Sequence, residues 1–190
     1  MVLFALVLTE CLLRPVTFGA DQPKLRTYEH LYQNDTYRYS VALPRGIIAR
    51  GAAPPNPNHG FTIALSVKNE SSPVYGPTDS FIWVDGSYIP QDDVQTLADA
   101  VQFAIRMTQE RRDTKVQVES ETEISLGGLR AVRLTSRVDG RGLKVIYQRV
   151  IALGEFMYTV GIQTTQARKA DDLKLLDEII SGFRLLPAGH

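Results

Sequence analysis

Apolar and polar residues alternate along several short stretches of the chain, and this pattern predicts β-strands. Three such stretches come early, at residues 37–43, 61–67 and 81–89. In the first of them, aromatic and aliphatic side chains at every second position share one face. Pro44 and Pro90 follow the first and third stretches, and proline ends a strand because it has no amide to donate. The first half of the chain therefore supplies three separate strands.

Two later stretches carry apolar residues at spacings of three and four, which predicts amphipathic helices at 92–112 and 171–181. Asp92 and Asp93 begin the first helix, where carboxylates cap free amides and face the positive end of the helix dipole. Capping accounts for both aspartates, so we do not interpret them as a catalytic pair. Gly182 follows the second helix as its C-terminal stop.

The segment between these helices predicts a four-stranded β-meander, with strands at about 116–125, 129–138, 143–153 and 156–164. Glycine-rich turns separate the strands, and a last short strand at 183–186 follows the second helix. The third strand of the meander is apolar on both faces, which is typical of a strand buried on both sides. We therefore expect both faces of this sheet to be covered, and the helices are available to cover them.

The first hairpin of the meander places acidic residues in one strand and arginines in the next. A two-residue loop would set Glu121 opposite Leu134. A three-residue loop sets Glu121 opposite Arg133, and Gln117 opposite Arg137. Opposite charges that face each other across a strand pair contribute roughly a few tenths of a kcal/mol each. We therefore predict a three-residue loop with a glycine bulge, and we expect the acidic row to be solvated.

Composition indicates an ordinary globular protein with no strong overall field. The chain has 190 residues, of which 44% are apolar, and this suits one domain with a sizeable core. Lysine and arginine together number 21, as do aspartate and glutamate. A neutral domain has no net field to hold a polyanion, so we expect no nucleic acid partner. The sequence also lacks the run of basic residues that would hold it to an anionic membrane surface.

The first twenty residues resemble a secretory signal peptide. They are mostly apolar, and they end in Phe18-Gly19-Ala20 before a polar segment. No basic residue precedes the apolar run and Glu10 interrupts it, so a buried N-terminal strand or helix is the alternative. We expect export to the periplasm or the medium, without stable membrane insertion after signal removal. Cys11 is the only cysteine and lies inside this segment.

These observations divide the chain into three parts: a signal peptide at 1–20, a polar and irregular lead-in at 21–36, and a single α+β domain at 37–187. We expect the domain to contain no resident metal or cofactor. The three histidines, His30, His59 and His190, are isolated from one another and from cysteine. No Gly-x-Ser-x-Gly elbow or phosphate-binding glycine loop is present, so we assign no catalytic residue.

Aromatic residues and prolines are concentrated in the loops and strands of the first half. Long loops often carry function, and tryptophan and tyrosine are favoured at binding surfaces. The candidate binding residues are His59, Phe61, Tyr75, Trp83 and Tyr88. The alternative for Phe61 and Trp83 is that both are ordinary core residues.

Three segments carry a resemblance to a known family. They are Tyr-Arg-Tyr-Ser-Val-Ala-Leu-Pro at 37–44, Gly-Leu-Arg-Ala-Val-Arg-Leu at 128–134, and Ile-Ile-Ser-Gly-Phe-Arg-Leu-Leu at 179–186. In this order of elements the chain resembles the PsbP-like superfamily, named for an extrinsic subunit of photosystem II, over residues 37–187. The resemblance implies an antiparallel β-sheet flanked by helices, an α/β/α sandwich. It also implies a protein that binds other proteins and has no catalytic motif.

We therefore expect a non-catalytic exported protein of the cell envelope, with a binding or accessory role that depends on contacts with another protein. Two alternatives remain open. One is a small-ligand carrier or enzyme with a pocket between the sheet and the helices. The other is an immunity protein that neutralises a secreted toxin.

Overall fold

The computed structural model describes residues 25–52, 59–66, 79–90, 92–112, 115–140 and 143–187. The expected signal peptide at 1–20, with Cys11, lies outside the described residues, as does Tyr75. Eleven strands and two helices form within the described ranges. No helix in these ranges is both long enough and apolar enough to cross a membrane.

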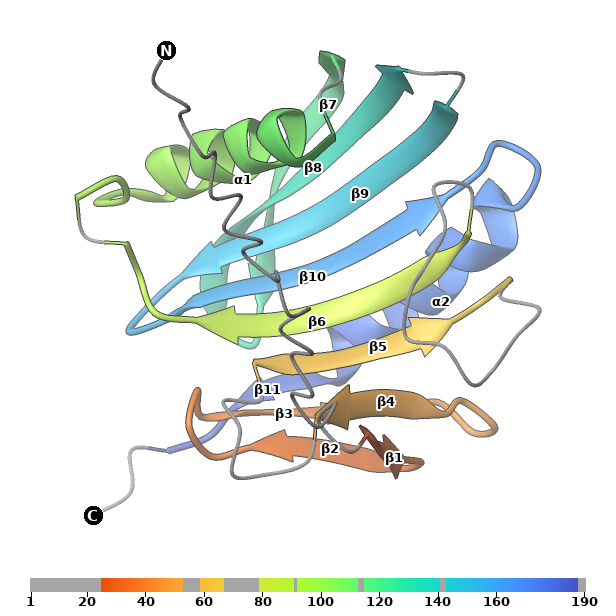
Figure 1. Ribbon diagram of the computed structural model, residues 1–190. Helices are drawn as coiled ribbons and strands as arrows, with labels where there is room; N and C mark the ends of the chain where they lie inside the picture. Colours follow the sequence, from red (N-terminus) through yellow and green to blue (C-terminus); the bar gives the residue numbers. More distant parts are fainter. Residues whose placement is uncertain are drawn as a thin grey trace, which may run out of the picture.

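Eight strands form one large antiparallel sheet (Figure 1). In spatial order they are β1 (Leu25–Tyr28), β4 (Ala49–Ala52), β5 (Gly60–Ala64), β6 (Phe81–Ser87), β10 (Met157–Thr164), β9 (Leu143–Leu153), β8 (Leu129–Gly140) and β7 (Lys115–Leu126). A smaller antiparallel sheet has the order β11 (Phe183–Leu185), β3 (Tyr39–Ala42) and β2 (Leu31–Asn34). The α+β class, the large antiparallel sheet and the two helices are thus confirmed, as is the predicted meander from β7 to β10.

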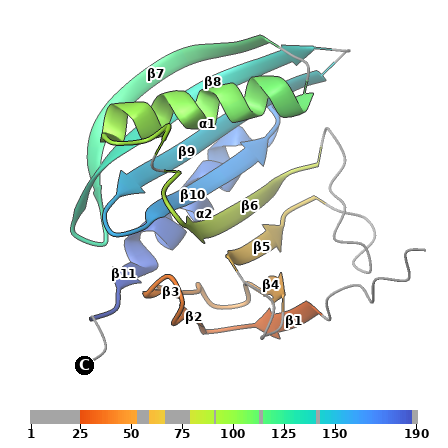
Figure 2. The ribbon, with the colours of Figure 1, turned by 60° about the vertical axis from the view of Figure 1, so that its left-hand side comes forward.

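Helix α1 (Leu97–Arg112) lies in front of the large sheet in Figures 1 and 2, and helix α2 (Lys169–Gly182) lies behind it. Alternate residues of β9 follow this division. Ile151 is buried in the same apolar cluster as Val101 of α1, whereas Val150 is buried with Leu176 and Ile179 of α2. The predicted burial of this strand on both faces is therefore confirmed.

The predicted three-residue loop of the first meander hairpin is wrong. Leu126 pairs with Leu129 around a two-residue turn, and Glu121 lies opposite Leu134. The turn residues Gly127 and Gly128 have φ values of +58° and +92°, which suit a type I′ turn and the right-handed twist of the flanking strands. Turn geometry and the burial of Leu126, which is 0% exposed, outweigh cross-strand charge pairing here.

A β-bulge farther along the same hairpin restores part of the expected register. The register shifts between Val118 and Ser120, and below this bulge Gln117 lies opposite Arg137, as predicted. Arg137 pairs with Glu119 at the bulge, at 2.5 Å. Most of β7 is exposed, so the acidic row is solvated as expected.

The segment at 21–36 was expected to be an irregular lead-in, but it contains two strands. Strand β1 pairs with β4 in the large sheet and β2 pairs with β3 in the small one. Alternation is visible in β2, where Tyr32 and Asn34 are buried and their neighbours are exposed. The burial of the polar Asn34 side chain is compensated by two hydrogen bonds. Its amide group donates to the Tyr32 hydroxyl at 3.1 Å, and its side-chain oxygen accepts from the Tyr37 backbone amide at 3.0 Å.

The predicted cap of the first helix is also wrong. The helix begins at Leu97, and its amides are capped by a reciprocal pair instead of by Asp92 and Asp93. The Thr96 amide donates to Asp99 Oδ2 at 2.8 Å, while the Asp99 amide donates to Thr96 Oγ1 at 3.2 Å. This is a capping box with aspartate in place of glutamate. Asp93 instead forms an ion pair with Arg106, in the third turn of the helix, at 3.3 Å.

Gly182 ends α2 for a reason other than a left-handed backbone. A Cβ at this position would lie 2.4 Å from the carbonyl oxygen of Ala42, so glycine permits close contact between the helix end and β3. Strand β11 follows directly and pairs with β3, which ties the C-terminal segment to the small sheet.

The capping box predicts a measurable titration. Hydrogen bonds from the Thr96 hydroxyl and from the Thr96 and Gln95 amides lower the pKa of Asp99 below its ordinary value of 3.8. The stability that this carboxylate contributes is therefore present above that ordinary value and is lost as the pH falls through the lowered pKa. Replacing Thr96 by valine should raise the pKa of Asp99 toward 3.8, as measured by carboxyl ¹³C NMR. An unchanged Asp99 titration in T96V would contradict the capping box.

The two turn glycines should respond differently to alanine. Both have positive φ, so either substitution should destabilise the fold by about 1–2 kcal/mol. At Gly127 the added Cβ would also lie 2.9 Å from the buried Phe183 ring, whereas at Gly128 it meets open space. G127A should therefore lose a further 1–3 kcal/mol, roughly. Urea unfolding compares the two variants, and equal losses would show that the ring of Phe183 does not constrain the turn.

Candidate functional site

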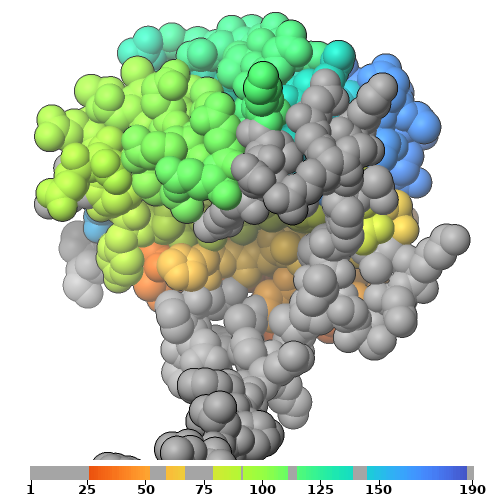
Figure 3. All heavy atoms as spheres, turned by 45° about the horizontal axis from the view of Figure 1, so that its top comes forward, coloured from red at the N-terminus to blue at the C-terminus, as the bar shows by residue number. Residues whose placement is uncertain are grey.

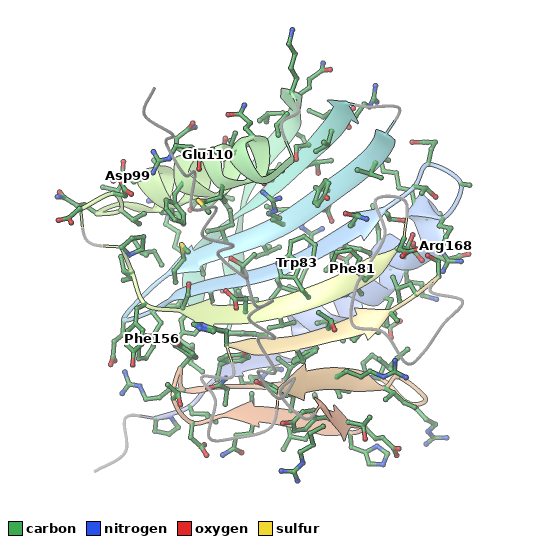
Figure 4. All side chains as sticks on the ribbon, viewed as in Figure 1. Phe81, Trp83, Asp99, Glu110, Phe156 and Arg168 are labelled. Atoms are coloured by element: carbon green, nitrogen blue, oxygen red, sulfur yellow. The ribbon has the colours of Figure 1, made fainter. Side chains whose placement is uncertain are left out.

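A groove of about 590 Å³ lies between α1 and the region of the large sheet formed by β6, β9 and β10. We call it the α1 groove. Figure 4 shows two of its residues, Phe81 and Trp83, next to each other on β6. Figure 3 shows α1 (green) on this side of the molecule, above the orange and yellow residues of the N-terminal strands. The lining comprises His59, Phe81, Trp83, Asp85, Ser87, Phe103, Ala104, Met107, Thr108, Tyr147, Arg149, Met157 and Thr159.

Strand β6 forms the sheet side of the groove because its residues alternate between two environments. Ile82 and Val84 are buried in the core on the α2 side of the sheet. Phe81 and Trp83 point to the opposite face and are half-buried. The period of two in a strand therefore presents a row of aromatic side chains toward α1.

Arg149 of β9 is the buried cation of the groove, at 7% exposure. Its guanidinium donates to the Ala104 carbonyl oxygen at 3.1 Å and to Thr108 Oγ1 at 2.6 Å, and both acceptors belong to α1. The guanidinium carbon also lies 5.8 Å from the ring centroid of Trp83 and 5.2 Å from that of Tyr147. Hydrogen bonds and cation–π contacts thus replace water around this charge and fasten α1 to the sheet.

Trp83 reaches Arg149 by lying across Gly161 of the intervening strand β10. The register places Gly161 between Trp83 and Arg149. A Cβ on Gly161 would lie 2.3 Å from Cζ2 of the indole, so only glycine leaves room for the ring. The ring of Tyr147 packs on the same tryptophan at 6.2 Å between centroids. A missing side chain on β10 therefore lets Trp83 form one wall of the groove.

His59 lies at one end of the groove, next to a buried tyrosine cluster. Its Nδ1 is 3.1 Å from the Gly86 carbonyl oxygen, and its ring stacks on Tyr37 at 5.1 Å. The hydroxyl of Tyr39 donates to the His59 carbonyl oxygen at 2.9 Å. Burial raises the pKa of Tyr39 well above its ordinary value of 10.0, so this hydroxyl keeps its proton and acts as a donor. The end of the groove is thus held by groups that are already hydrogen-bonded.

The structure brings two of the five candidate binding residues into one groove, His59 and Trp83. Phe61 lies in the core on the other face, 3% exposed, with its ring 4.6 Å from that of Tyr32. Tyr88 is 68% exposed and packs edge-on against Tyr37, whose ring also contacts His59. Tyr75 is outside the described residues, and the binding role of all five stays a prediction.

Sequence reasoning did not find the side of the groove formed by α1, β9 and β10. Phe103 and Met107 belong to the helix, where an apolar residue is expected in any case. One signal was present: Arg149 interrupts a strand that is apolar on both faces, between Tyr147 and Ile151 on the same side. A charge in such a strand indicates a polar partner or a site, because a lone buried charge is unstable.

The chemistry that this arrangement supports is binding by surface complementarity. Among the described residues, no three or more histidine, cysteine, aspartate or glutamate side chains come close enough together to hold a metal ion. The polar side chains Arg149, Thr108 and His59 already have hydrogen-bonding partners within the protein. Asp85, Thr159 and Ser87 also line the groove, and the buried Ser87 hydroxyl has no hydrogen-bond partner among the described residues. Most of the other lining side chains are aromatic rings and methionines, which adapt to varied apolar surfaces.

The contact between Trp83 and Gly161 can be tested with an internal reporter, because Trp83 is the only tryptophan of the chain. Replacing Gly161 by alanine should displace the indole, shift its fluorescence emission, and destabilise the fold by about 1–3 kcal/mol. In a W83A background the same G161A change should have much less effect, because the clashing ring is gone. If G161A is equally destabilising in both backgrounds, the loss comes from the backbone of β10 instead.

No family model matches the sequence, and no curated protein matches it. Solved structures are similar. The cyanobacterial PsbP (CyanoP) of Synechocystis sp. has a TM-score of 0.50 at 18% sequence identity, over 88% of this chain and 95% of that one. The Ran-binding protein Mog1p of Saccharomyces cerevisiae has a TM-score of 0.53 at 11% identity, over 86% of this chain and 97% of that one. The chain therefore has the PsbP-like fold that its sequence resemblance implied.

Proposed function

We propose that this chain is a non-catalytic binding or accessory protein of the cell envelope, and that it holds a partner protein in the α1 groove. The observation that carries the proposal is the lining of the groove, where aromatic rings and two methionines surround a cation that is already hydrogen-bonded. Surfaces of this composition are enriched at protein interfaces, because large rings bury much apolar area with little loss of side-chain freedom.

The interior of the groove argues for complementarity over chemistry. A catalytic site needs a nucleophile, or an acid and a base, that is within reach of the substrate and free to react. In the α1 groove the Thr108 hydroxyl donates to the Ala104 carbonyl oxygen and accepts from Arg149, so it is occupied twice. A Thr108 hydroxyl that holds α1 to the sheet in this way fits a binding protein better than an enzyme.

The similar structures add support of a limited kind. One of them is described as a Ran-binding protein, so this fold has been used to bind another protein. We extend to this chain only the mode, contact between proteins, and not the partner. Nucleic acid fits the neutral composition poorly.

The remaining parts of the proposal concern organisation and location. We propose the α/β/α sandwich as the description of the layers, with α1 on one face and α2, beside the small sheet, on the other. The proposal also includes a signal peptide at 1–20 and a single domain, which comprises the expected range 37–187 together with strands β1 and β2. The apolar segment that ends in Phe18-Gly19-Ala20 supports a periplasmic or secreted location.

A small-ligand carrier or enzyme is the second candidate, because the groove has a volume typical of ligand sites. Its volume of about 590 Å³ falls inside the range of roughly 300–1,000 Å³ for such sites. It also lies between the sheet and a helix, where this alternative requires a pocket.

Site-specific photo-cross-linking in the organism of origin tests the proposal. A photo-reactive amino acid at Thr159 samples the α1 groove, and the same group at the exposed Lys174 of α2 is the matched control on the opposite face. We expect one envelope protein to be captured reproducibly from position 159 and not from 174. Adding W83A should reduce the yield at least about fivefold, because a central tryptophan is the residue type that dominates interface energy.

Equal capture from positions 159 and 174, or capture that is unaffected by W83A in a folded variant, would contradict partner binding in the groove. The carrier alternative has its own readout. Mass spectrometry of the protein purified from its native extract would then detect one small molecule in near-stoichiometric amount, and W83A would remove it.

A further inference from the structure

A second concave surface lies on the opposite face of the large sheet, where the β7–β8 turn meets the end of α2. It is an open hollow of about 630 Å³, and we call it the α2 hollow. Figure 2 shows the turn between β7 and β8 close to the point where α2 leads into β11. Its polar lining consists of Ser125, Arg133, Asp177, Ser181 and Arg184, beside the turn glycines.

Arg133 has more donor capacity than its protein partners use. Its Nη2 donates to Asp177 Oδ1 at 2.7 Å. Its buried Nε has no hydrogen-bond acceptor among the described residues. A guanidinium carries five N–H groups, and a buried donor without an acceptor destabilises the fold unless something else binds it. The Arg133 side chain as a whole is 27% exposed and lines the hollow, although Nε itself is buried.

Arg184 adds a second cation to the same hollow. Its Nη1 donates to the carbonyl oxygens of Ser181 and Phe183, at 2.6 and 2.7 Å. These carbonyls lie at the C-terminal end of α2, where the helix dipole is negative and would repel an anion. The full charge of Arg184 outweighs the roughly half charge of the dipole, and it masks the oxygens by binding them.

The charges around the hollow sum to a positive value. Arg133 and Arg184 contribute two positive charges and Asp177 contributes one negative charge, which leaves one positive charge over. Ser125 adds a hydroxyl at the rim. The Ser181 hydroxyl donates to the Glu178 carbonyl oxygen, so its contribution is an oxygen and not a free proton. Planar guanidinium groups that face one space are the usual protein ligands of carboxylate and phosphate.

We propose that the α2 hollow binds an oxyanion, a phosphate or carboxylate group, between Arg133 and Arg184. The anion accepts from the donors of Arg133 that Asp177 leaves unused, and Arg184 supplies the second charge. This site is independent of the α1 groove, because it lies on the other face and shares no lining residue with it.

Titration of the full chain with inorganic phosphate and with acetate, at constant ionic strength, tests the proposal by ¹⁵N NMR of the arginine side chains. We expect saturable shifts at Arg133 and Arg184. R184Q keeps the ion pair between Arg133 and Asp177, and it should weaken binding at least about fivefold, as loss of a charge-assisted contact does. D177N removes the competing carboxylate and should tighten binding about threefold or more.

The matched control is R130Q. Arg130 lies on β8, as Arg133 does, but outside the hollow, and it forms an ion pair with Glu123 at 2.8 Å. Its loss should leave anion affinity unchanged. Preference for phosphate over acetate would assign a phosphate group, and the reverse would assign a carboxylate. Shifts that never saturate, equal effects of R130Q and R184Q, or weaker binding in D177N would each overturn the site.

Discussion

The width of the large sheet exceeds what one helix can cover, and this constraint organises much of the molecule. A helix with its side chains is about 10–12 Å across and strands lie about 4.8 Å apart, so a helix shields roughly two or three strands. The sheet has eight strands, and α1 packs on β7, β8 and β9. Within the described ranges, α1 is the only helix on this face, and the strands from β10 onward lie beyond its main contacts. The large rings of Phe81, Trp83 and Tyr147 lie on the sheet at the edge of the area that α1 covers. The groove therefore follows from the geometry of the fold, whether or not a ligand binds there.

Arg149 shows how the boundary between helix and uncovered sheet is stabilised. A buried guanidinium is unfavourable unless its donors and its charge are both compensated. Here the helix supplies the acceptors, through the Ala104 carbonyl and the Thr108 hydroxyl. The sheet supplies the aromatic faces, and Trp83 reaches the cation because Gly161 has no side chain in its path. Three strands and one helix must therefore be in place together, so this contact specifies the position of α1 as well as stabilising it.

Much of the architecture could be predicted because burial imposes a simple period on each element. The meander strands, the two-sided β9 and the inner face of α2 all follow from apolar spacing alone. The errors arose where a local interaction overrode that spacing. At the first hairpin, two glycines with positive φ and the buried Leu126 decided the turn, and a bulge then restored the register near Gln117. At α1, the Thr96 and Asp99 pair had a geometry that two neighbouring aspartates could not reproduce.

The candidate groove was harder to anticipate than the fold, since it joins elements far apart in the chain. The residue types of Trp83 and His59 predict a binding surface, and both residues line the groove. The residue type of Phe61 supports the same prediction, yet its register opposite the buried Val84 directs it to the other face of the sheet, into the core. Alternate residues of a strand point to opposite faces of the sheet, so the position of a residue in its strand decides whether it lies in the core or in the groove. Which face carries the groove depends on where a helix distant in sequence packs. That information belongs to tertiary packing.

The state of the polar groups in the groove also indicates how a ligand would gain its affinity. Arg149 and Thr108 are bonded to each other and to α1, so a ligand that competed for them would have to break contacts that hold the helix. Binding without that loss comes mainly from apolar area, at roughly 25 cal/mol per Å² removed from water, with Ser87 as a hydroxyl that has no partner within the described protein. The aromatic and methionine side chains offer such area to a side chain or a short segment of a partner protein. Interaction by burial, with little new hydrogen bonding, is the mode that disturbs this fold least.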